Sequence, residues 1–277
     1  MPTARKPHDL RARDIVLSHF TLGRHHDITN RLDAAAAAGC AAIGLYIRDY
    51  QRLLSEGTAP GELTEMLDAR NLCLAEIEAL RGWSDATPTD DYLEQERTAF
   101  EMANAFECRY VQAIGPTVDD PRAAAAGFAA LCDRAADHGL VVGFEFLPFT
   151  NVVDATAALR LVQDADRANG GVCVDIWHHQ RGANDLALIR AIPGDRVMGI
   201  QMSDGPLTPT LDSYYDDTLR TRVPPGEGEM DVAGFVEAVQ STGTAVPWSL
   251  EVCNEANWDK DATEFVQASA DGLRRFL

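Results

Sequence analysis

Four apolar segments in the second half of the chain each contain one side chain with an oxygen donor. These side chains are Glu145, Asp175, Gln201 and Glu251. Each lies near the end of a run that is typical of a buried strand. Three carboxylates that converge at low dielectric repel one another strongly, and a bound cation removes that repulsion. Because the four donors are hard oxygens, the set favours Mn²⁺ or Mg²⁺ over zinc or copper.

Nitrogen-bearing and aromatic side chains near these segments are candidates for substrate contact. His178 lies three residues after Asp175, beyond the predicted strand, where it can hydrogen-bond a substrate oxygen. A solvent-facing loop histidine is the alternative. His19, at the end of the first predicted strand, is a candidate for the same pocket. Trp83, Trp177 and Phe149 are suited to an apolar wall against a sugar or ring face, although core packing explains them nearly as well.

The segments that position these residues alternate between strand-like and helix-like patterns. The predicted strands cover residues 14–22, 41–46, 72–80, 109–114, 140–146, 171–176, 196–202 and 248–252. Apolar strands joined by helices indicate a parallel sheet that is covered on both faces. Eight such units in 277 residues predict a single α/β domain, a (β/α)8 TIM barrel over residues 1–277, rather than a doubly wound sheet. The active site of such a barrel lies at the C-terminal ends of its strands.

The predicted helices follow these strands in order. They cover residues 27–38, 60–70, 91–106, 121–138, 154–167, 185–191, 231–242 and 262–277. The longest loop covers residues 204–230, and long loops are usually functional. Within it we expect Asp204 to hold the loop in place rather than to contact substrate. On the third predicted strand Glu76 and Glu78 alternate with apolar residues, so one of them is expected to face inward.

Composition limits the location and the partners of the protein. Lys and Arg total 24 and Asp and Glu total 43, which gives a net charge of −19. This surface repels nucleic acid and anionic membranes, and an anionic substrate needs a local positive centre. Residues 1–14 lack the apolar core of a signal peptide, and no apolar run reaches the roughly 18 residues that cross a membrane. The six cysteines form no CxxC pair, and no nucleotide-binding motif is present. We therefore expect a cytoplasmic protein with a small-molecule partner.

The strand-end residues, the Asp175-x-x-His178 spacing and Arg222 before Pro225-Gly226-Glu227-Gly228 resemble the xylose isomerase-like barrel superfamily of sugar isomerases, epimerases and dehydratases. The resemblance covers nearly the whole chain. It implies that the metal ligands are Glu145, Asp175, Gln201 and Glu251. It also implies that Arg222 contacts substrate, with an exposed loop arginine as the alternative, and that the protein forms a dimer or tetramer. Many epimerases of the family have histidine where this chain has Gln201, whereas glutamine occurs among dehydratase-type relatives.

Two enzyme classes fit these residues. A divalent ion that bridges the carbonyl and hydroxyl oxygens of a keto-sugar or keto-polyol stabilises an enediolate, and Glu145 and Glu251 resemble the acid and base that move protons. His178 is the third candidate catalytic residue. We expect an isomerase or epimerase first. The same groups can expel a β-hydroxyl, which is the chemistry of a dehydratase (lyase) acting on dehydroshikimate or an inosose.

Two further alternatives are remote. Endonuclease IV shares this barrel, but its histidine-rich site and its basic DNA-contacting loops fit poorly with seven histidines and a net charge of −19. A non-catalytic binding barrel predicts no bound metal and tolerance of Glu145→Gln.

Overall fold

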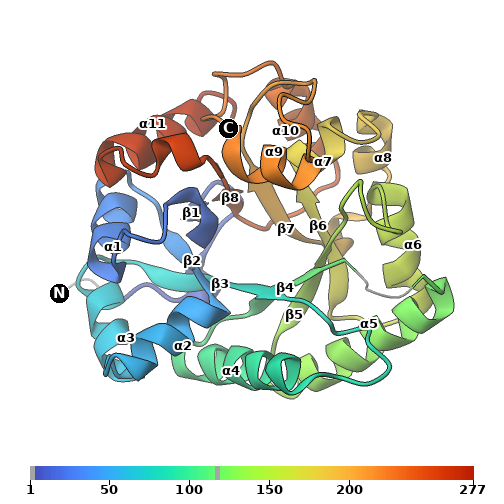
Figure 1. Ribbon diagram of the computed structural model, residues 1–277, viewed down its shortest axis with the longest axis horizontal. Helices are drawn as coiled ribbons and strands as arrows, with labels where there is room; N and C mark the ends of the chain where they lie inside the picture. Colours follow the sequence, from blue (N-terminus) through green and yellow to red (C-terminus); the bar gives the residue numbers. More distant parts are fainter. Residues whose placement is uncertain (1–3, 116–118) are drawn as a thin grey trace.

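Eight parallel strands close into a barrel in this computed structural model, which describes residues 4–115 and 119–277. Residues 1–3, the start of the charged lead-in, lie outside the described part. The strands are β1 (Ile15–Leu17), β2 (Ala42–Tyr46), β3 (Cys73–Leu80), β4 (Tyr110–Ile114), β5 (Val141–Glu145), β6 (Gly170–Asp175), β7 (Val197–Met202) and β8 (Trp248–Leu250). They pair in sequence order, and β1 pairs with β8 to close the ring (Figure 1). The predicted barrel is confirmed.

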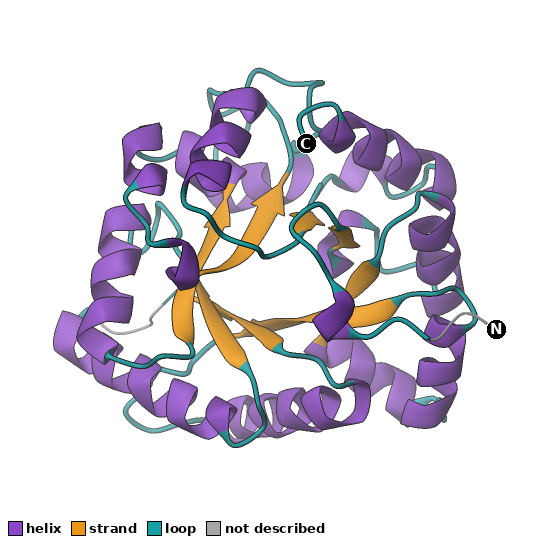
Figure 2. Cartoon of the chain, turned by 180° about the vertical axis from the view of Figure 1, so that it is seen from behind, coloured by secondary structure: helices purple, strands orange, loops and turns teal. Residues whose placement is uncertain are grey.

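Helices surround the strands, as Figure 2 shows from the opposite side. The helices that follow the strands are α1 (Ile28–Ala37), α3 (Pro60–Asp68), α4 (Asp90–Phe106), α5 (Pro121–Ala136), α6 (Ala155–Ala165), α8 (Leu186–Arg190), α10 (Val232–Ser241) and α11 (Ala262–Arg274). Several begin at an acidic cap: Asp27 accepts from the Asn30 N–H and Asp154 from the Ala157 N–H, both at 2.8 Å. Such caps satisfy N–H groups that the first helical turn leaves unpaired. Within the described residues, no helix is both long enough and apolar enough to cross a membrane.

Three further helices occupy segments that were expected to be loops. They are α2 (Ile47–Ser55), α7 (Ile176–Gln180) and α9 (Tyr214–Arg220). α2 directly follows β2, α7 directly follows β6, and α9 lies in the long segment after β7. Five residues in α7 and seven in α9 are too few for a clear helical period in the sequence.

The main hydrophobic core lies between the barrel and its helices. Trp83, after β3, packs edge-to-face on Phe128 of α5 and Phe144 of β5, with ring centroids 5.6 and 5.9 Å apart. Both phenylalanines are fully buried. Burial of one such side chain contributes about 2–3 kcal/mol to stability. This packing holds the strands in place and leaves their other faces directed into the barrel.

The register of the strands sets the level of the polar residues. Asp175 on β6 pairs with Gln201 on β7, and Gln201 pairs with Ser249 on β8. Glu145, the last residue of β5, pairs with Cys173 on β6. In this register Glu145 and Glu251 are each offset by two residues from the Asp175–Gln201 pair, and each of the four oxygen donors lies within one residue of the C-terminal end of its strand.

The first strand is shorter than predicted. β1 ends at Leu17, and the 3-10 turn η2 (His19–Thr21) follows it. Ser18 caps this turn by accepting a hydrogen bond from the Phe20 N–H at 3.3 Å. A serine hydroxyl that bonds nearby backbone competes with strand pairing. His19 therefore lies in a turn and not at the end of a strand.

Candidate active site

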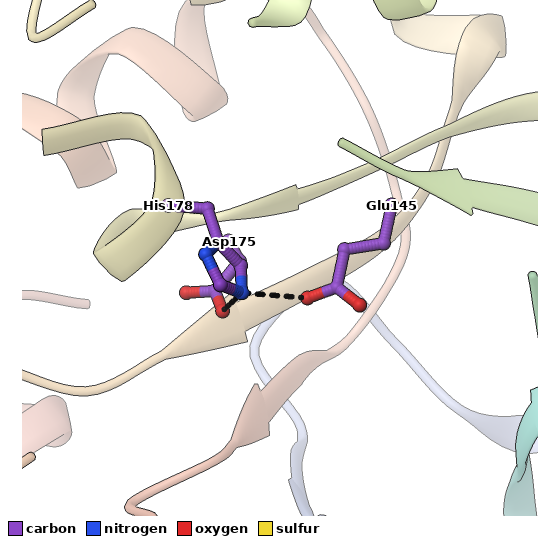
Figure 3. A group of neighbouring side chains, drawn as sticks. All are labelled: Glu145, Asp175 and His178. Atoms are coloured by element: carbon purple, nitrogen blue, oxygen red, sulfur yellow. Dashed lines mark ion pairs between the residues drawn. The ribbon is translucent and has the colours of Figure 1, made fainter. Parts of the chain in front are cut away.

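Glu145, Asp175 and His178 lie together at the C-terminal ends of β5 and β6 (Figure 3). His178 Nε2 is 3.4 Å from Glu145 Oε1 and 3.5 Å from Asp175 Oδ2. One ligand atom from each residue lies within 4.8 Å of the other two, and all three side chains are buried. Because α7 begins directly after Asp175, its first turn brings His178 back over the strand end. These residues form a candidate metal site.

Hydrogen bonds connect Gln201 and Glu251 to the same group. Gln201 Nε2 donates to Glu251 Oε1 at 2.9 Å. Gln112 Nε2, from β4, donates to Glu145 Oε2 at 2.8 Å and to Gln201 Oε1 at 3.4 Å. Gln112 was not predicted from the sequence, although a single polar residue inside an apolar strand is the same signal that singled out Gln201. The network fixes the carboxylates of Glu145 and Glu251.

Arg222 lies inside the site and binds its carboxylates. Its Nη1 donates to Asp175 Oδ2 at 2.9 Å and to Glu251 Oε2 at 3.1 Å. Its Nε donates to the Thr218 carbonyl at 3.1 Å. The side chain is 1% exposed, so the exposed-loop alternative is wrong. Its contact with substrate stays a prediction, and the atom available for it is Nη2, which lies 3.5 Å from His178 Nε2.

The positive charge around the buried carboxyl groups is too small to balance all of them. Burial, together with the charges of Glu251 and Asp175, raises the pKa of Glu145 well above its ordinary value. Burial raises the pKa of Glu251 to about 7, although Arg222 opposes the change. Burial lowers the pKa of His178 to about 3, so this ring is neutral at pH 7. Buried carboxylates, an amide oxygen and a neutral imidazole suit a divalent cation. The residues therefore fit a metal held by Glu145, Asp175 and Glu251, with Gln201 or His178.

A second pair of carboxyl groups, Glu76 and Glu78 of β3, lies inside the barrel. Glu76 Oε2 accepts from Ser249 Oγ at 2.7 Å. Glu78 accepts from Ser18 Oγ and from the His19 N–H, both at 3.0 Å. Both residues face inward, whereas only one was expected to. Burial raises the pKa of Glu76 to about 8 and the pKa of Glu78 well above its ordinary value, which favours the protonated form of both at pH 7.

His19 contacts protein groups rather than the strand-end carboxylates. Its Nε2 lies 2.5 Å from Asp49 Oδ2 on α2. Its ring packs against Phe20 and Tyr46, with centroids 5.6 and 5.9 Å away. Its Nδ1 is buried and has no hydrogen-bond partner among the described residues. A role of His19 in substrate binding stays a prediction.

Trp177 lies between two arginines. The guanidinium carbons of Arg181 and Arg222 are 4.7 and 5.3 Å from the centre of its ring system. The indole is fully buried, and its Nε1 donates to Thr218 Oγ1 at 3.0 Å. These contacts account for its position through packing and cation–π attraction. Its predicted contact with substrate stays a prediction.

Asp204 holds the long segment after β7, as expected. Its Oδ1 accepts from the N–H groups of Gly205 and Met230 at 2.7 and 2.9 Å, and its Oδ2 from the Gly226 N–H at 2.9 Å. One carboxylate therefore fixes both ends of a segment of more than twenty residues.

This segment brings Tyr214 of α9 to His178. The phenol oxygen of Tyr214 lies 3.1 Å from His178 Nδ1. The ring of Tyr214 also lies 5.3 Å from that of Phe149, in the loop after β5. Phe149 is 51% exposed. Two loops thus meet beside the candidate metal site through an aromatic pair.

Arg81 is an exposed cation one residue past the end of β3. Burial dominates the raised pKa of Glu145, and the charge of Arg81 is one of two that lower that pKa. Among the described residues, Arg81 has neither an ion pair nor a side-chain hydrogen bond. It was not predicted from the sequence, because an arginine just past a strand is usually a solvated side chain.

Comparison with known proteins identifies relatives by sequence. A sequence profile of the family described as xylose isomerase-like TIM barrel matches residues 32–275. A 3-dehydroshikimate dehydratase of Pseudomonas putida is 28% identical over 259 residues, and one of Pseudomonas aeruginosa is 27% identical over 257 residues. Each alignment covers 90% of this chain and 39% of the relative. The chain thus spans about two fifths of the length of these curated relatives.

Solved structures share the barrel. A xylose isomerase-like TIM barrel/4-hydroxyphenylpyruvate dioxygenase fusion protein matches with a TM-score of 0.82 at 25% identity, over 95% of this chain and 42% of that chain. An IOLI protein crystallised with a binding zinc atom matches at 0.83 and 17% identity, over 95% and 99%. The probable 3-DHS dehydratase AsbF of Bacillus anthracis matches at 0.78 and 18% identity, over 94% and 98%. At these lower identities the likeness concerns the fold alone.

Proposed function

This chain belongs to the xylose isomerase-like TIM barrel family, and we propose that it is a divalent-metal-dependent dehydratase of a cyclic β-hydroxy ketone that carries a carboxylate. 3-Dehydroshikimate is the substrate of this kind that its relatives suggest. The main support is the similarity, over 90% of the chain, to two proteins named 3-dehydroshikimate dehydratase. The isomerase or epimerase that we expected first becomes the alternative, because neither of these relatives has such a name.

Dehydration of a β-hydroxy ketone requires two proton transfers. A base takes the proton from the carbon beside the carbonyl. An acid then protonates the β-hydroxyl, whose C–O bond breaks so that water leaves. Glu145, at the end of β5, and Glu251, just after β8, take these two roles. When bound, a divalent cation stabilises the negative charge that develops on the carbonyl oxygen.

The surrounding residues position this pair. Gln112 holds the Glu145 carboxylate, and Gln201 holds Glu251. Arg222 keeps Asp175 and Glu251 close together despite their charges. His178, with Nε2 directed at Glu145 and Asp175, is placed to hydrogen-bond a substrate oxygen. These contacts reduce the rearrangement that the site needs during the reaction.

Arg81 is the residue that we assign to the substrate carboxylate. A chain with a net charge of −19 needs a local positive centre to attract an anion. Arg222 is already bonded to two carboxylates, whereas Arg81 is exposed and has no ion-pair partner among the described residues. A guanidinium binds a carboxylate through two parallel hydrogen bonds.

An absorbance assay distinguishes the candidate functions. Loss of water from 3-dehydroshikimate gives an aromatic dihydroxybenzoate, which absorbs in the near ultraviolet. We expect rising absorbance with the wild type and with Glu237→Gln, a control on the exposed face of α10, but not with Glu251→Gln. Conversion of a keto-sugar without absorbance would favour the isomerase. No turnover and no bound metal, even after Mn²⁺ is added, would favour a binding barrel.

A further inference from the structure

A cavity of about 520 Å³ lies between the long segment after β7 and the beginning of α11. Part of its lining comes from Val223, Pro224 and Glu227. The rest comes from residues 254–268, which include the end of the 3-10 turn η4 (Glu255–Asn257) and the first turns of α11, the red helix of Figure 1. Among the described residues that line it, none belongs to the candidate metal site. Its volume is that of a typical small-molecule site.

Asn257 places a nearly buried amide beside this cavity. Its side chain belongs to the lining and is 8% exposed. Its backbone groups are paired with Asn254 and Lys260, but within residues 4–115 and 119–277 its side-chain amide has no hydrogen-bond partner. The amide of Asn254, in contrast, donates to the Arg222 carbonyl and accepts from the Ala256 N–H. The Asn257 amide therefore needs water or a polar ligand in the cavity as its partner.

Carboxylates outnumber cations in the lining. Glu227, Asp261 and Glu264 each supply a carboxylate. Asp261 accepts from the Glu264 N–H at 3.0 Å, whereas the carboxylates of Glu227 and Glu264 have neither an ion pair nor a hydrogen bond in the described part of the chain. The one ammonium is that of Lys260, an exposed residue whose flexible stem lets the charge turn to solvent. The cavity therefore favours a cation over an anion.

Apolar side chains complete the lining, and among them Pro224 and Phe265 are buried. We infer that this cavity binds a small organic ammonium ion. The carboxylates of Glu227 and Glu264 attract its charge, and the Asn257 amide oxygen accepts one of its N–H groups. Its apolar body lies against Pro224 and Phe265.

An occupant of this site lies close to Arg222 along the chain. Val223 and Pro224 directly follow Arg222, and Asn254, in the same lining, donates to the Arg222 carbonyl at 2.8 Å. A bound ammonium ion that contacts Glu227 and Glu264 thus links the segment that carries Arg222 to α11. Because the site exists only in the folded chain, its ligand should raise the temperature of unfolding.

Three probes that share one ring test the charge of the ligand. At pH 7 benzylammonium is a cation, benzyl alcohol is neutral and benzoate is an anion. By calorimetric titration of the full chain we expect saturable binding of about one benzylammonium, with benzyl alcohol about five- to twentyfold weaker and benzoate not bound. Absence of benzylammonium binding, equal binding of benzyl alcohol, or tighter binding of benzoate would each overturn the inference.

Variants locate the bound probe. Glu227→Gln and Glu264→Gln, at exposed positions, should each weaken benzylammonium binding about two- to fivefold. Asn257→Leu should weaken it as well, and if this variant fails to fold, the two glutamine variants test the same claim. Glu237→Gln on α10 is the matched control and should bind as the wild type does.

Glu251→Gln separates this site from the candidate active site, and it should also keep the wild-type affinity for benzylammonium. Wild-type affinity in both Glu227→Gln and Glu264→Gln, or loss of binding in Glu251→Gln alone, would place the probe elsewhere and contradict the inference. These titrations need no substrate, so they are decided independently of the proposed dehydration.

Discussion

The guanidinium of Arg222 and the carboxylate of Asp175 form an ion pair of 2.9 Å in which neither side chain is more than 1% exposed. The same Nη1 also contacts Glu251 at 3.1 Å. One cation therefore serves two buried carboxylates, and within residues 4–115 and 119–277 Glu145 has only the neutral His178 at ion-pair distance. This deficit of positive charge is the physical reason that the site should bind a divalent metal.

Removal of the Arg222 charge should destabilise the metal-free protein. Arg222→Met leaves the carboxylates of Asp175 and Glu251 buried without the cation that pairs with both, and loss of such a partner typically costs about 3–5 kcal/mol. Arg220→Met is the control, because Arg220 forms exposed ion pairs with Asp216 and Glu255, which contribute about 0–1 kcal/mol. Urea unfolding in the presence of EDTA measures the free energy of unfolding of both variants. Equal midpoints for the two variants would contradict the role of Arg222 as the internal counter-ion.

Gly44 on β2 leaves the space that Glu78 occupies. A Cβ at this position would lie 1.8 Å from Glu78 Oε1, so Gly44→Ala must displace a carboxyl group that accepts from Ser18 and His19. We expect a loss of about 1–3 kcal/mol. Gly61→Ala, in open space on α3, should be neutral or stabilising by about 0.5–1 kcal/mol. Thermal unfolding compares them, and a Gly44→Ala protein as stable as wild type would show that Glu78 moves freely.

Local patterns predicted the barrel well, because apolar runs, glycines and caps report each strand and helix separately. They also located Glu145, Asp175, Gln201 and Glu251, since one polar residue inside each of several apolar runs is unusual. The short helices α7 and α9 show no clear helical period of apolar residues in the sequence. Their position, and with it that of Tyr214, depends on contacts such as those of Asp204 with Gly226 and Met230.

Long-range contacts account for the other differences. A loop arginine is usually solvated, and Arg222 is buried only because strands far apart in the sequence bring Asp175 and Glu251 to it. Glu76 and Glu78 are two residues apart on β3, so a regular strand directs both to the same face, and Gly44 on the neighbouring strand leaves room for them. The spacing is visible in the sequence, whereas the contacts of Arg222 and the space beside Gly44 are not.

His19 should make the protein sensitive to acid. Burial lowers its pKa from 6.5 to about 4, although a hydrogen bond to Asp49 opposes the change. The unfolded chain therefore takes up a proton more readily than the folded protein. The stability contributed by neutral His19 is complete above pH 6.5 and is lost as the pH falls toward 4. Between pH 7 and pH 5 the expected loss is about 2 kcal/mol.

Urea unfolding at both pH values tests this effect. His19→Asn should show a smaller loss of stability than wild type, whereas His8→Asn, at an exposed position, should keep the wild-type dependence. An identical pH dependence in the His19 variant would assign the acid sensitivity to other groups.

Arg81 should determine the affinity for the substrate carboxylate. Arg81→Ala should raise KM for 3-dehydroshikimate about ten- to hundredfold, because a charge-assisted pair contributes about 1.5–3 kcal/mol. Turnover at saturation should change little. Arg160→Ala, at an exposed position on α6, is the control. Steady-state kinetics of the wild type, Arg81→Ala and Arg160→Ala measures KM and kcat for each protein. An unchanged KM in Arg81→Ala would show that another group binds the carboxylate.

The most direct measurement of the central claim is the absorbance change of 3-dehydroshikimate incubated with metal-stripped protein before and after Mn²⁺ or Mg²⁺ is added. The proposed function predicts no change in EDTA-treated, dialysed protein, and full activity after about one ion binds per chain. Asp175→Asn should bind the ion poorly and stay inactive. Undiminished activity in protein shown by elemental analysis to be free of metal, or no activity in protein that has bound the ion, would contradict a metal-dependent dehydratase.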